Sequence, residues 1–456
     1  MSKEKALKKL KTLLNHRLEM NPYVLKEHSK SEAFFPEYSP DAVVFAKDEE
    51  EIVKIVKICS QERFPIIPWG SGTSLEGHTL PKNGGLVLNL SQMNKILEIN
   101  NQDMYAIVEP GVKRKFLNEE LRSTGLFFSV DPGADASLGG MASTGASGTT
   151  TVRYGTIRDN ILSLEVVTSD GEIIKIGNKA KKSSSGYDLK SIFIGSEGTL
   201  GIITKLTLKL NSIPEAISSA VCNFPSIQDA VNASTLIIQS GIPIARLELV
   251  DEKSISIINS YSNTELREKP HLFLEFHGSK KSVIEQTEEV KVIFSDFNMN
   301  EFKWSSKTEE RNKLWKARHN AFYAYKSYYS DREAIVTDVC LPISKLTDII
   351  LDTQKDIERS GLPGPIIGHV GDGNFHAVLM VRKNNVEDHT KASKIISNMV
   401  IKSINFNGTS SGEHGIGLGK TKFMEREHGK SLKIMKIIKK SLDPKGIMNP
   451  GKIFLE

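Results

Sequence analysis

The sequence predicts an α+β fold made of two large parts. From about residue 36 to 215 the chain is rich in Gly, Ser and Thr and in short runs of β-forming residues. From about 216 onward, strands alternate with amphipathic helices, which is typical of a sheet covered by helices on one face. With 456 residues, the chain is also too long for one hydrophobic core at about 150 residues per domain. We therefore expect a domain boundary near 211–215.

The first part opens with a helical segment, 1–35, in which leucines recur at helical spacing from Leu7 to Leu18. Beyond it, an amphipathic pattern predicts a helix over 48–63, and short apolar runs bounded by turn residues predict strands. The expected strands are 42–45, 65–68, 86–90, 105–109 and 162–167.

In the second part, apolar runs predict strands at 218–223, 245–250, 271–277, 334–341, 365–370 and 375–381. Amphipathic patterns predict helices over 226–239, 281–295, 343–360 and 387–405. The turn-rich segment 442–452 still carries apolar residues, so we expect it to dock on the rest of the molecule. The chain has no internal repeat.

Composition excludes several classes of function. A net charge of +5, from 60 basic and 55 acidic residues, does not favour a nucleic-acid-binding protein. Lys433, Lys436, Lys439 and Lys440 lie at helical spacing and are interpreted as a solvated helix face. Three scattered cysteines predict no disulfide and favour a reducing compartment. The absence of an apolar run of membrane-spanning length and of a signal-peptide core makes a cytoplasmic location the expectation.

Three glycine-rich loops, 69–77, 131–149 and 195–203, lie in the first part. Glycines permit positive φ and close backbone approach, so consecutive N–H groups can converge on an anion. The glycines are not spaced as G-x-G-x-x-G before a helix, so the loops are not a Rossmann fingerprint. One such loop is more often a turn, but three in one domain predict a dinucleotide held by backbone amides.

Histidines and acids gather at two places in the second part. His369 and His376 flank a Gly-Asp-Gly-Asn turn, and Glu413 and His414 stand side by side between glycines. Two His and one Glu suffice as protein ligands for a catalytic divalent ion with open positions. His414 would then be a base beside the metal. Each of the first two histidines alone could be a strand-end residue satisfied by backbone, but the Glu413–His414 pair favours the ligand interpretation.

Three further residues carry weaker signals. Arg318 could bind an anionic group, or it could simply pair with Glu309 or Glu310 on its own helix. We interpret His319, on the same helix, and His277, at the end of a strand, as structural.

Together these segments resemble the FAD-linked oxidases of the vanillyl-alcohol-oxidase type. Within that family, the resemblance is strongest to the branch of D-lactate dehydrogenase (cytochrome) and the glycolate oxidase FAD subunit. It rests on motifs that run in order over nearly the whole chain: 68–77, 130–149, 152–160, 193–204, 317–321, 337–344, 368–376, 411–420 and 448–452.

The resemblance implies a two-subdomain FAD-binding domain of that type (PCMH-type) over 36–215 and an α+β, ferredoxin-like substrate cap over 216–430. The segment 431–456 would dock back on the FAD domain. Covalent relatives use a His or Cys where this chain has small residues, with His78 just outside the first loop, so non-covalent FAD is expected. The implied cofactor-binding residues are Pro68, Trp69, Gly70, Ser71, Gly72, Thr73, Ser74, Asp131, Pro132, Gly133, Leu138, Gly139, Gly140, Ser143, Thr144, Gly145, Ser147, Gly148, Tyr154, Gly155, Glu197, Gly198, Gly201, Ile202, Ile203 and Asn449.

The resemblance also implies an activity: FAD-dependent oxidation of D-lactate to pyruvate, with hydride transfer to flavin N5. His369, His376 and Glu413 would bind one divalent metal ion, with zinc first and manganese or iron as alternatives. His414 would be the base, and Arg318 would bind the substrate carboxylate. Cytochrome c, a quinone or an electron-transfer flavoprotein would accept the electrons. A homodimer is left open, and a mitochondrial location is expected if the source is eukaryotic.

Alternative functions remain at this point. Relatives that act on 2-hydroxyglutarate carry polar groups where this chain has Phe322 and Val336, so a short or apolar substrate tail is expected. Glycolate or another D-2-hydroxy acid is the nearest alternative. A flavin-dependent transferase would keep the glycine loops but would not need three metal ligands. A metal hydrolase would leave the glycine loops unexplained.

Overall fold

The computed structural model describes residues 2–32 and 34–455, which form two compact units. Of these residues, the first unit comprises 2–32, 34–147, 155–213 and 413–455, and the second comprises 148–154 and 214–412. Both units mix helices and sheets, which confirms the predicted α+β class. The chain passes between the units four times, at Ser147–Gly148, Tyr154–Gly155, Ile213–Pro214 and Gly412–Glu413. The four-part division expected from the sequence stays a prediction.

The first unit contains a parallel three-stranded sheet of order β1-β3-β2 and an antiparallel five-stranded sheet of order β4-β5-β9-β7-β8. A small pair, β10-β6, completes its strands. The strands are β1 Ala42–Phe45, β2 Ile66–Trp69, β3 Leu86–Asn89, β4 Ile96–Asn100, β5 Tyr105–Val108, β6 Leu126–Phe127, β7 Ile161–Val167, β8 Ile173–Gly177, β9 Ile202–Lys209 and β10 Asn211–Ser212. The α-helices are α1 Ser2–Leu14, α2 Pro22–Glu27, α3 Glu49–Glu62, α4 Arg114–Glu120, α5 Leu138–Thr144, α7 Leu189–Phe193, α15 Met424–His428 and α16 Ser431–Leu442.

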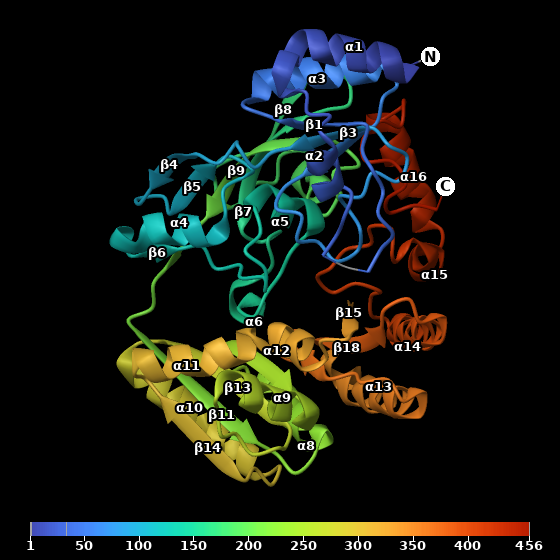
Figure 1. The fold of residues 1–456 in the computed structure, drawn as a ribbon. Coiled ribbons are helices and arrows are strands. Elements are labelled where there is room, and N and C mark those ends of the chain that lie inside the picture. The colour runs from blue at the N-terminus through green and yellow to red at the C-terminus, as the bar shows by residue number, and fades with distance from the viewer. Residues whose placement is uncertain (1, 33, 456) are drawn as a thin grey trace. The chain divides into compact units, whose positions relative to one another are not determined.

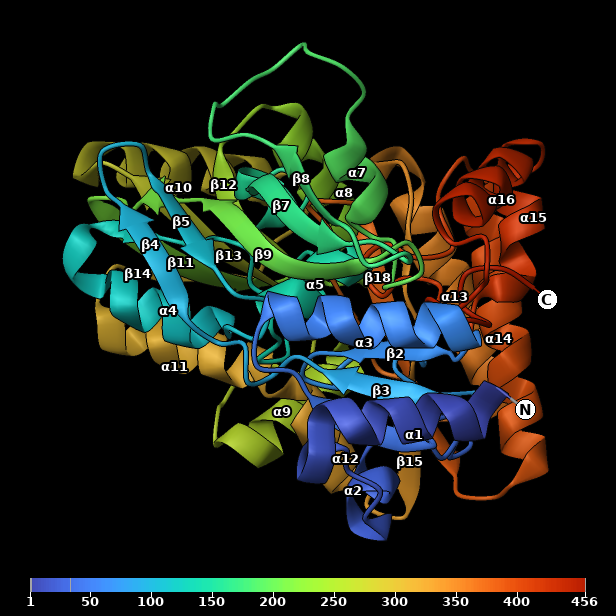
Figure 2. The same ribbon diagram turned by 90° about the horizontal axis from the view of Figure 1, so that it is seen from above.

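Helix α3 illustrates how the sequence sets the first unit. The Asp48 side chain caps the helix by accepting a hydrogen bond from the amide of Glu51 at 2.8 Å. Ile52, Ile55 and Cys59 recur at helical spacing and are fully buried in one cluster with the strands of the parallel sheet. Helices α1 and α3 lie side by side over this sheet (Figures 1 and 2).

The end of the chain adds to the same sheet. The amide of Ile66 in β2 donates to the carbonyl of Ile447, and the amide of Asn449 donates back to the carbonyl of Ile66, each at 2.8 Å. Both Ile447 and Met448 are buried in the cluster that α1 and α3 cover. The segment after α16 is therefore attached to β2 by backbone bonds and by apolar contact.

The second unit is built on one antiparallel sheet of order β14-β11-β13-β12-β17-β18-β15, with β16 also paired to β18. Its strands are β11 Ala216–Asn223, β12 Ile244–Val250, β13 His271–Gly278, β14 Glu301–Ser305, β15 Arg332–Val336, β16 Val339–Cys340, β17 Ile366–Gly368 and β18 Asn374–Arg382. Its α-helices are α6 Thr151–Tyr154, α8 Ile227–Gln239, α9 Glu252–Ser262, α10 Lys280–Ser295, α11 Thr308–His319, α12 Ala321–Tyr328, α13 Leu346–Ser360 and α14 Val386–Asn405.

One predicted strand is wrong as a single element. The run 334–341 divides into β15 and β16, because Thr337 and Asp338 leave the strand geometry between them. The Thr337 amide still donates to the Ala377 carbonyl at 3.0 Å, while its own carbonyl accepts from a histidine ring. Apolar periodicity alone does not reveal such an interruption, because the residues on both sides of it face the core.

Two other sequence expectations can be compared with the structure. Within residues 2–32 and 34–455, no helix has the length and apolar character to cross a membrane. Cys59, Cys222 and Cys340 are free thiols, as their spacing predicted.

Candidate metal and flavin sites

A tight turn brings the two predicted histidine ligands together. His369 follows the last residue of β17, and His376 lies in β18, which pairs with β17 in antiparallel register. At Gly373 φ is +78°, and a Cβ atom would lie 2.1 Å from the Leu341 carbonyl oxygen. Only glycine fits there, so the Gly-Asp-Gly-Asn sequence is what allows the chain to reverse between the two histidines.

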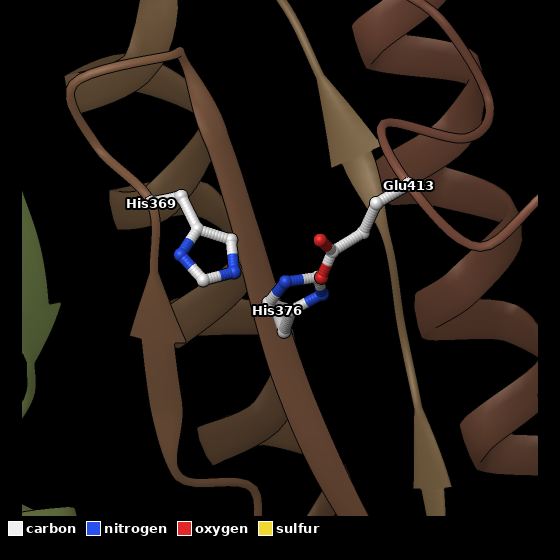
Figure 3. A group of neighbouring side chains, drawn as sticks. All are labelled: His369, His376 and Glu413. Atoms are coloured by element: carbon white, nitrogen blue, oxygen red, sulfur yellow. The ribbon is translucent and has the colours of Figure 1, made fainter. Parts of the chain in front are cut away.

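His369, His376 and Glu413 form a group that could hold a metal ion. Each offers one ligand atom, and these atoms all lie within 4.8 Å of one another (Figure 3). Two imidazoles and one carboxylate are a donor set that zinc, manganese and iron accept, with positions left for a substrate. The residues that the sequence predicted as ligands are thus brought together.

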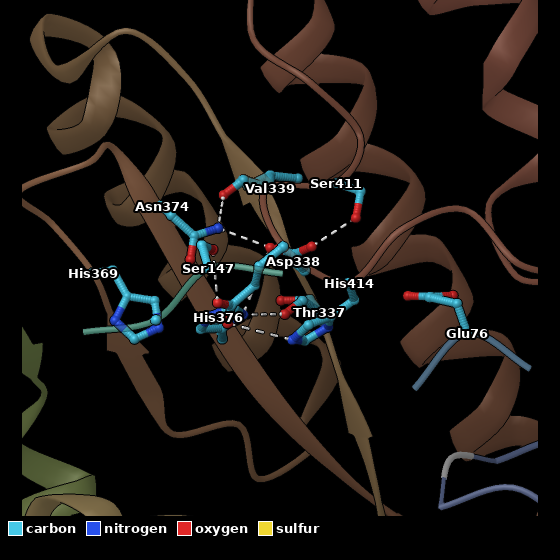
Figure 4. A network of polar contacts seen from close by, with 12 residues as sticks. Glu76, Ser147, Thr337, Asp338, Val339, His369, Asn374, His376, Ser411 and His414 are labelled. Atoms are coloured by element: carbon cyan, nitrogen blue, oxygen red, sulfur yellow. Dashed lines mark hydrogen bonds and ion pairs between the residues drawn. The ribbon is translucent and has the colours of Figure 1, made fainter. Parts of the chain in front are cut away.

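Both imidazoles are oriented by a hydrogen bond on Nδ1. His369 Nδ1 donates to Glu248 Oε1 at 2.6 Å. His376 Nδ1 donates to the Thr337 carbonyl at 2.8 Å (Figure 4). A carbonyl and a carboxylate only accept, so in each neutral ring the proton sits on Nδ1 and the lone pair on Nε2. This arrangement fixes the tautomer that a metal-ligating histidine needs.

Glu248 is a residue of this site that was not predicted from the sequence. It lies in β12 between Leu247 and Leu249 and is fully buried. A buried carboxylate is unfavourable unless it is paired, and an acid inside an otherwise apolar strand was a signal that could have identified it. Its pairing partners, however, are remote in sequence and could not be read from spacing.

Arg318 lies in α11, and its Nη2 donates to Glu248 Oε2 at 2.6 Å. The alternative that it pairs with Glu309 or Glu310 is wrong: Glu310 instead pairs with Lys307 at 3.2 Å. Arg318 is buried, and among the described residues its Nε has no hydrogen-bond partner. The guanidinium is therefore fixed by Glu248 at one nitrogen and retains donor capacity at another.

The interruption between β15 and β16 supplies a second buried acid. Asp338 accepts hydrogen bonds from Asn374 Nδ2 at 2.7 Å and from Ser411 Oγ at 2.8 Å (Figure 4). Asn374 also donates to the Val339 carbonyl at 2.8 Å. These bonds connect the Gly-Asp-Gly-Asn turn to the residues that precede Glu413.

His414, the predicted base, has its Nε2 3.6 Å from Glu413 Oε1, and Glu413 Oε2 accepts from Ser147 Oγ at 3.1 Å. Its imidazole thus lies next to one of the three candidate ligands. His319 is exposed and its Nδ1 bonds to the Trp315 carbonyl at 2.7 Å. His277 lies between Glu275, at 2.9 Å, and the Tyr154 hydroxyl, at 2.7 Å.

The first glycine loop fits a bound anion. In the described chain, the backbone amides of 70–74 donate no hydrogen bond to other protein groups. The hydroxyls of Ser74 and Ser137 are buried, and neither has a hydrogen-bond partner within the described ranges. A Cβ on Gly70 would lie 2.3 Å from Ser137 Oγ, so the loop packs tightly against the start of α5. Amides and hydroxyls of this kind suit phosphate oxygens of a dinucleotide.

The remaining predicted cofactor residues lie in both units. Gly148 and Tyr154 belong to the second unit, and the others belong to the first. Pro68 and Trp69 end β2, residues 138–144 form α5, and Ile202 and Ile203 begin β9. Two side chains have other partners: Glu197 accepts from Ile416 and Gly417, and Asn449 donates to the carbonyls of His78 and Glu197. The residues placed in loops are Gly70, Ser71, Gly72, Thr73, Ser74, Asp131, Pro132, Gly133, Gly145, Ser147, Gly148, Gly155, Glu197, Gly198, Gly201 and Asn449.

Comparison with known families matches most of the chain. Residues 40–177 match an FAD binding domain, and residues 213–453 match the C-terminal domain of FAD linked oxidases. The chain is 46% identical over 434 residues to a probable mitochondrial D-lactate dehydrogenase of Danio rerio, covering 94% of this chain and 87% of the relative. It is 43% identical over 450 residues to the mitochondrial D-lactate dehydrogenase (cytochrome) of Arabidopsis thaliana, covering 98% and 79%. A glycolate oxidase subunit of Bacillus subtilis is 33% identical over 426 residues, covering 92% and 90%.

Solved structures confirm the fold. p-Cresol methylhydroxylase superimposes with a TM-score of 0.82 at 18% identity, covering 100% of this chain and 97% of the other. Alkyldihydroxyacetonephosphate synthase superimposes with a TM-score of 0.77 at 21% identity, covering 98% and 84%. At such identities the likeness concerns the fold alone.

Proposed function

This chain belongs to the FAD-linked oxidase family, and from that premise we propose that it oxidises a short D-2-hydroxy acid, D-lactate first, with non-covalent FAD. Relatives at 38–46% identity are named D-lactate dehydrogenases. When bound, FAD accepts a hydride, so the protein's task is to bind and orient the substrate and to take up its hydroxyl proton.

The observation that carries the proposal is the group formed by His369, His376 and Glu413. These three residues would hold a divalent ion, and such an ion lowers the pKa of a hydroxyl that it coordinates. Zinc, manganese and iron all accept this donor set. We propose zinc first, with manganese and iron as alternatives. Glu248 and Thr337 orient the two imidazoles toward this task.

Two further residues would act on the substrate itself. Arg318 would bind the carboxylate through its guanidinium, whose orientation the buried Glu248 fixes. His414, adjacent to Glu413, would receive the hydroxyl proton on an imidazole nitrogen. A base and a carboxylate-binding cation are the groups that hydride removal from a 2-hydroxy acid requires from the protein.

Two apolar residues of the second unit favour a short substrate tail. Phe322 and Val336 are partly buried and pack against an apolar cluster that contains Trp315 and Ala321. Neither side chain could bind a second carboxylate. We therefore infer D-lactate or a similarly short acid such as glycolate, in preference to a dicarboxylate.

The electron acceptor is proposed from the same relatives. Three of them carry the qualifier "cytochrome" in their names, which makes cytochrome c the first acceptor to test, followed by a quinone and an electron-transfer flavoprotein. A homodimer remains a further proposal. A mitochondrial location, named for the eukaryotic relatives, and a cytoplasmic one are alternatives to be decided by imaging the tagged chain in its source cells.

The deciding experiment is an anaerobic visible spectrum of the purified protein before and after D-lactate. We expect flavin bands that bleach with D-lactate, persist with L-lactate, and persist with D-lactate after the metal is removed by a chelator. If glycolate bleaches the flavin and D-lactate does not, the substrate assignment moves to glycolate. If neither acid reduces a flavin that is present, the dehydrogenase proposal fails and a flavin-dependent transferase becomes the better candidate.

A further inference from the structure

Glu197 has an unusual backbone and a fully engaged carboxylate. It lies just before β9 with φ +55°, a left-handed conformation that a non-glycine residue adopts at a cost, and its side chain is buried. Oε1 accepts the amide of Ile416 at 2.6 Å, and Oε2 accepts the amide of Gly417 at 2.8 Å. One carboxylate thus holds two consecutive amides of a segment more than 200 residues away.

A buried histidine completes this contact. His78 Nε2 lies 3.3 Å from Glu197 Oε1, and both side chains are almost fully buried. Burial alone raises the pKa of the Glu197 carboxyl, but His78 and the two backbone amides outweigh burial, so this pKa lies below its ordinary value. The carboxylate is therefore charged at neutral pH and accepts strong hydrogen bonds.

The segment fits this pair only because it is glycine-rich. A Cβ atom on Gly415 would lie 2.7 Å from His78 Nε2 and 2.8 Å from Glu197 Oε1, and φ at Gly415 is +79°. Asn449 Nδ2 in addition donates to the backbone carbonyls of Glu197, at 2.7 Å, and His78, at 3.0 Å. One asparagine side chain thus ties the backbones of Glu197 and His78 together.

We propose that Glu197 is a positioning residue for the metal site: by clamping Ile416 and Gly417, it fixes the loop that presents Glu413 and His414. The inference rests on the proposed function of that site. The loop needs such a clamp because its glycines leave the backbone free to adopt many conformations. Removing a group that orients a metal ligand typically lowers the metal affinity by about 10- to 100-fold.

This role differs from the cofactor contact expected from the sequence. Both carboxylate oxygens of Glu197 accept loop amides, its amide donates to the Ser143 carbonyl at 2.8 Å, and its carbonyl accepts from Asn449. Its hydrogen-bonding groups are thus used within the protein. A substitution should therefore change the metal site before it changes flavin binding.

The test is Glu197→Gln, in which an amide NH₂ replaces one acceptor and faces a backbone N–H group. With the FAD-loaded protein, zinc affinity is measured by competition with a chromogenic chelator, and FAD content by absorbance. Hydrogen exchange of the peptide covering 414–418 is followed by mass spectrometry. We expect zinc to bind at least about tenfold more weakly, at unchanged FAD content, with faster exchange at Ile416 and Gly417.

Asp443→Asn is the matched control. Asp443 is also a buried carboxylate of the first unit, and it accepts the amides of Ile447 and Met448 at 3.0 and 2.8 Å. Its loss should lower thermal stability without changing zinc affinity. Equal zinc affinity in Glu197→Gln and wild type, or an equal loss in both variants, would overturn the proposal.

Glu197→Asp provides a second variant, because it keeps the charge but is too short to reach both amides. It should weaken zinc binding in the same direction. If neither variant folds, the wild type still decides: rapid exchange of the Ile416 and Gly417 amides would show that no clamp exists. If the wild type binds no zinc, manganese or iron, the proposed function fails. Slow exchange of the Ile416 and Gly417 amides would in that case still show that Glu197 holds the loop.

Discussion

His369 donates its Nδ1 proton to Glu248 across 2.6 Å, and the same carboxylate accepts from Arg318 on its other oxygen at 2.6 Å. The candidate metal ligand and the candidate substrate-binding arginine are thus held by one fully buried acid. Such an acid sets the distance between the two groups, because neither can move without breaking a charge-assisted hydrogen bond in a low-dielectric interior.

Glu248→Gln should therefore impair both groups. An amide can accept at only one oxygen, so either His369 or Arg318 loses its partner. We expect zinc affinity and kcat/KM for D-lactate each to fall by roughly 10- to 100-fold. Glu275→Gln is the control. Glu275 lies in β13, next to the strand that carries Glu248, and it pairs with His277 and Arg246 but not with a candidate ligand. Comparable losses in both variants would mean that the effect is one of stability.

His414→Gln should abolish the proton-accepting group while leaving the candidate ligands in place. The rate of flavin reduction by D-lactate should fall by about 10²- to 10⁴-fold, the usual contribution of a general base. Zinc content, measured by atomic emission, should not change. His319→Gln, on an exposed histidine bonded to the Trp315 carbonyl, should reduce neither quantity. Retention of the full reduction rate in His414→Gln would remove this residue from the mechanism.

Arg318→Lys should raise the KM for D-lactate, with a smaller effect on the FAD and zinc content of the protein. Lysine keeps the charge but cannot bond the substrate carboxylate through two fixed N–H groups while also reaching Glu248. We expect kcat/KM to fall by about 10- to 100-fold, because the variant loses a hydrogen bond to a charged group and such a bond contributes a free energy of this size. Arg311→Lys, on the same helix, is the comparison, because among the described residues the Arg311 side chain donates a hydrogen bond only to Thr308. An unchanged KM would argue against a carboxylate-binding role.

Gly72→Ala should release FAD. At Gly72 φ is +71°, and a Cβ atom would lie 2.5 Å from the Trp69 ring, so the loop with the unbonded amides must shift. We expect a lower flavin-to-protein ratio after gel filtration. Gly241→Ala has nearly the same φ, +72°, but nothing within 4 Å of the added methyl group. It carries the same backbone cost, and its FAD content should remain that of the wild type.

Acid stability provides a test of the second unit. Burial lowers the pKa of His271 to about 4, although the bond from its Nδ1 to the Lys269 carbonyl opposes the shift. In the unfolded chain His271 binds a proton near pH 6.5, whereas in the folded chain it binds one only near pH 4. The neutral imidazole therefore contributes to the unfolding free energy above pH 6.5, and this contribution is lost as the pH falls toward 4. The unfolding free energy should decrease by about 1.4 kcal/mol per pH unit over that window.

His271→Asn removes this titration. Its thermal midpoint relative to the wild type should therefore rise steadily as the pH is lowered from 6.5 to 4. Differential scanning fluorimetry across that range measures the difference. The exposed His16 is the control position: the midpoint of His16→Asn should follow the wild type at every pH. Parallel curves for His271→Asn and the wild type would contradict the assignment of a buried, neutral imidazole.

The sequence by itself determined the features that depend on neighbours along the chain. Apolar periodicity placed α3 and β18 within one or two residues, and the turn at 371–374 predicted that His369 and His376 approach each other. Motif resemblance identified the flavin-linked family. These features follow from local backbone preference, from side-chain spacing, and from residue types that suit one chemistry.

Only the tertiary structure decided which buried charges meet. Glu248 is 70 residues from Arg318 and 121 from His369, and Glu197 is 219 from Ile416. The break between β15 and β16 likewise depends on two residues of β18. The His376 ring donates to the Thr337 carbonyl, and the Asn374 side chain donates to the Asp338 carboxylate. A buried carboxylate must find donors wherever the fold places them. The pairing therefore depends on the packing of distant strands and loops, which local spacing in the sequence does not encode.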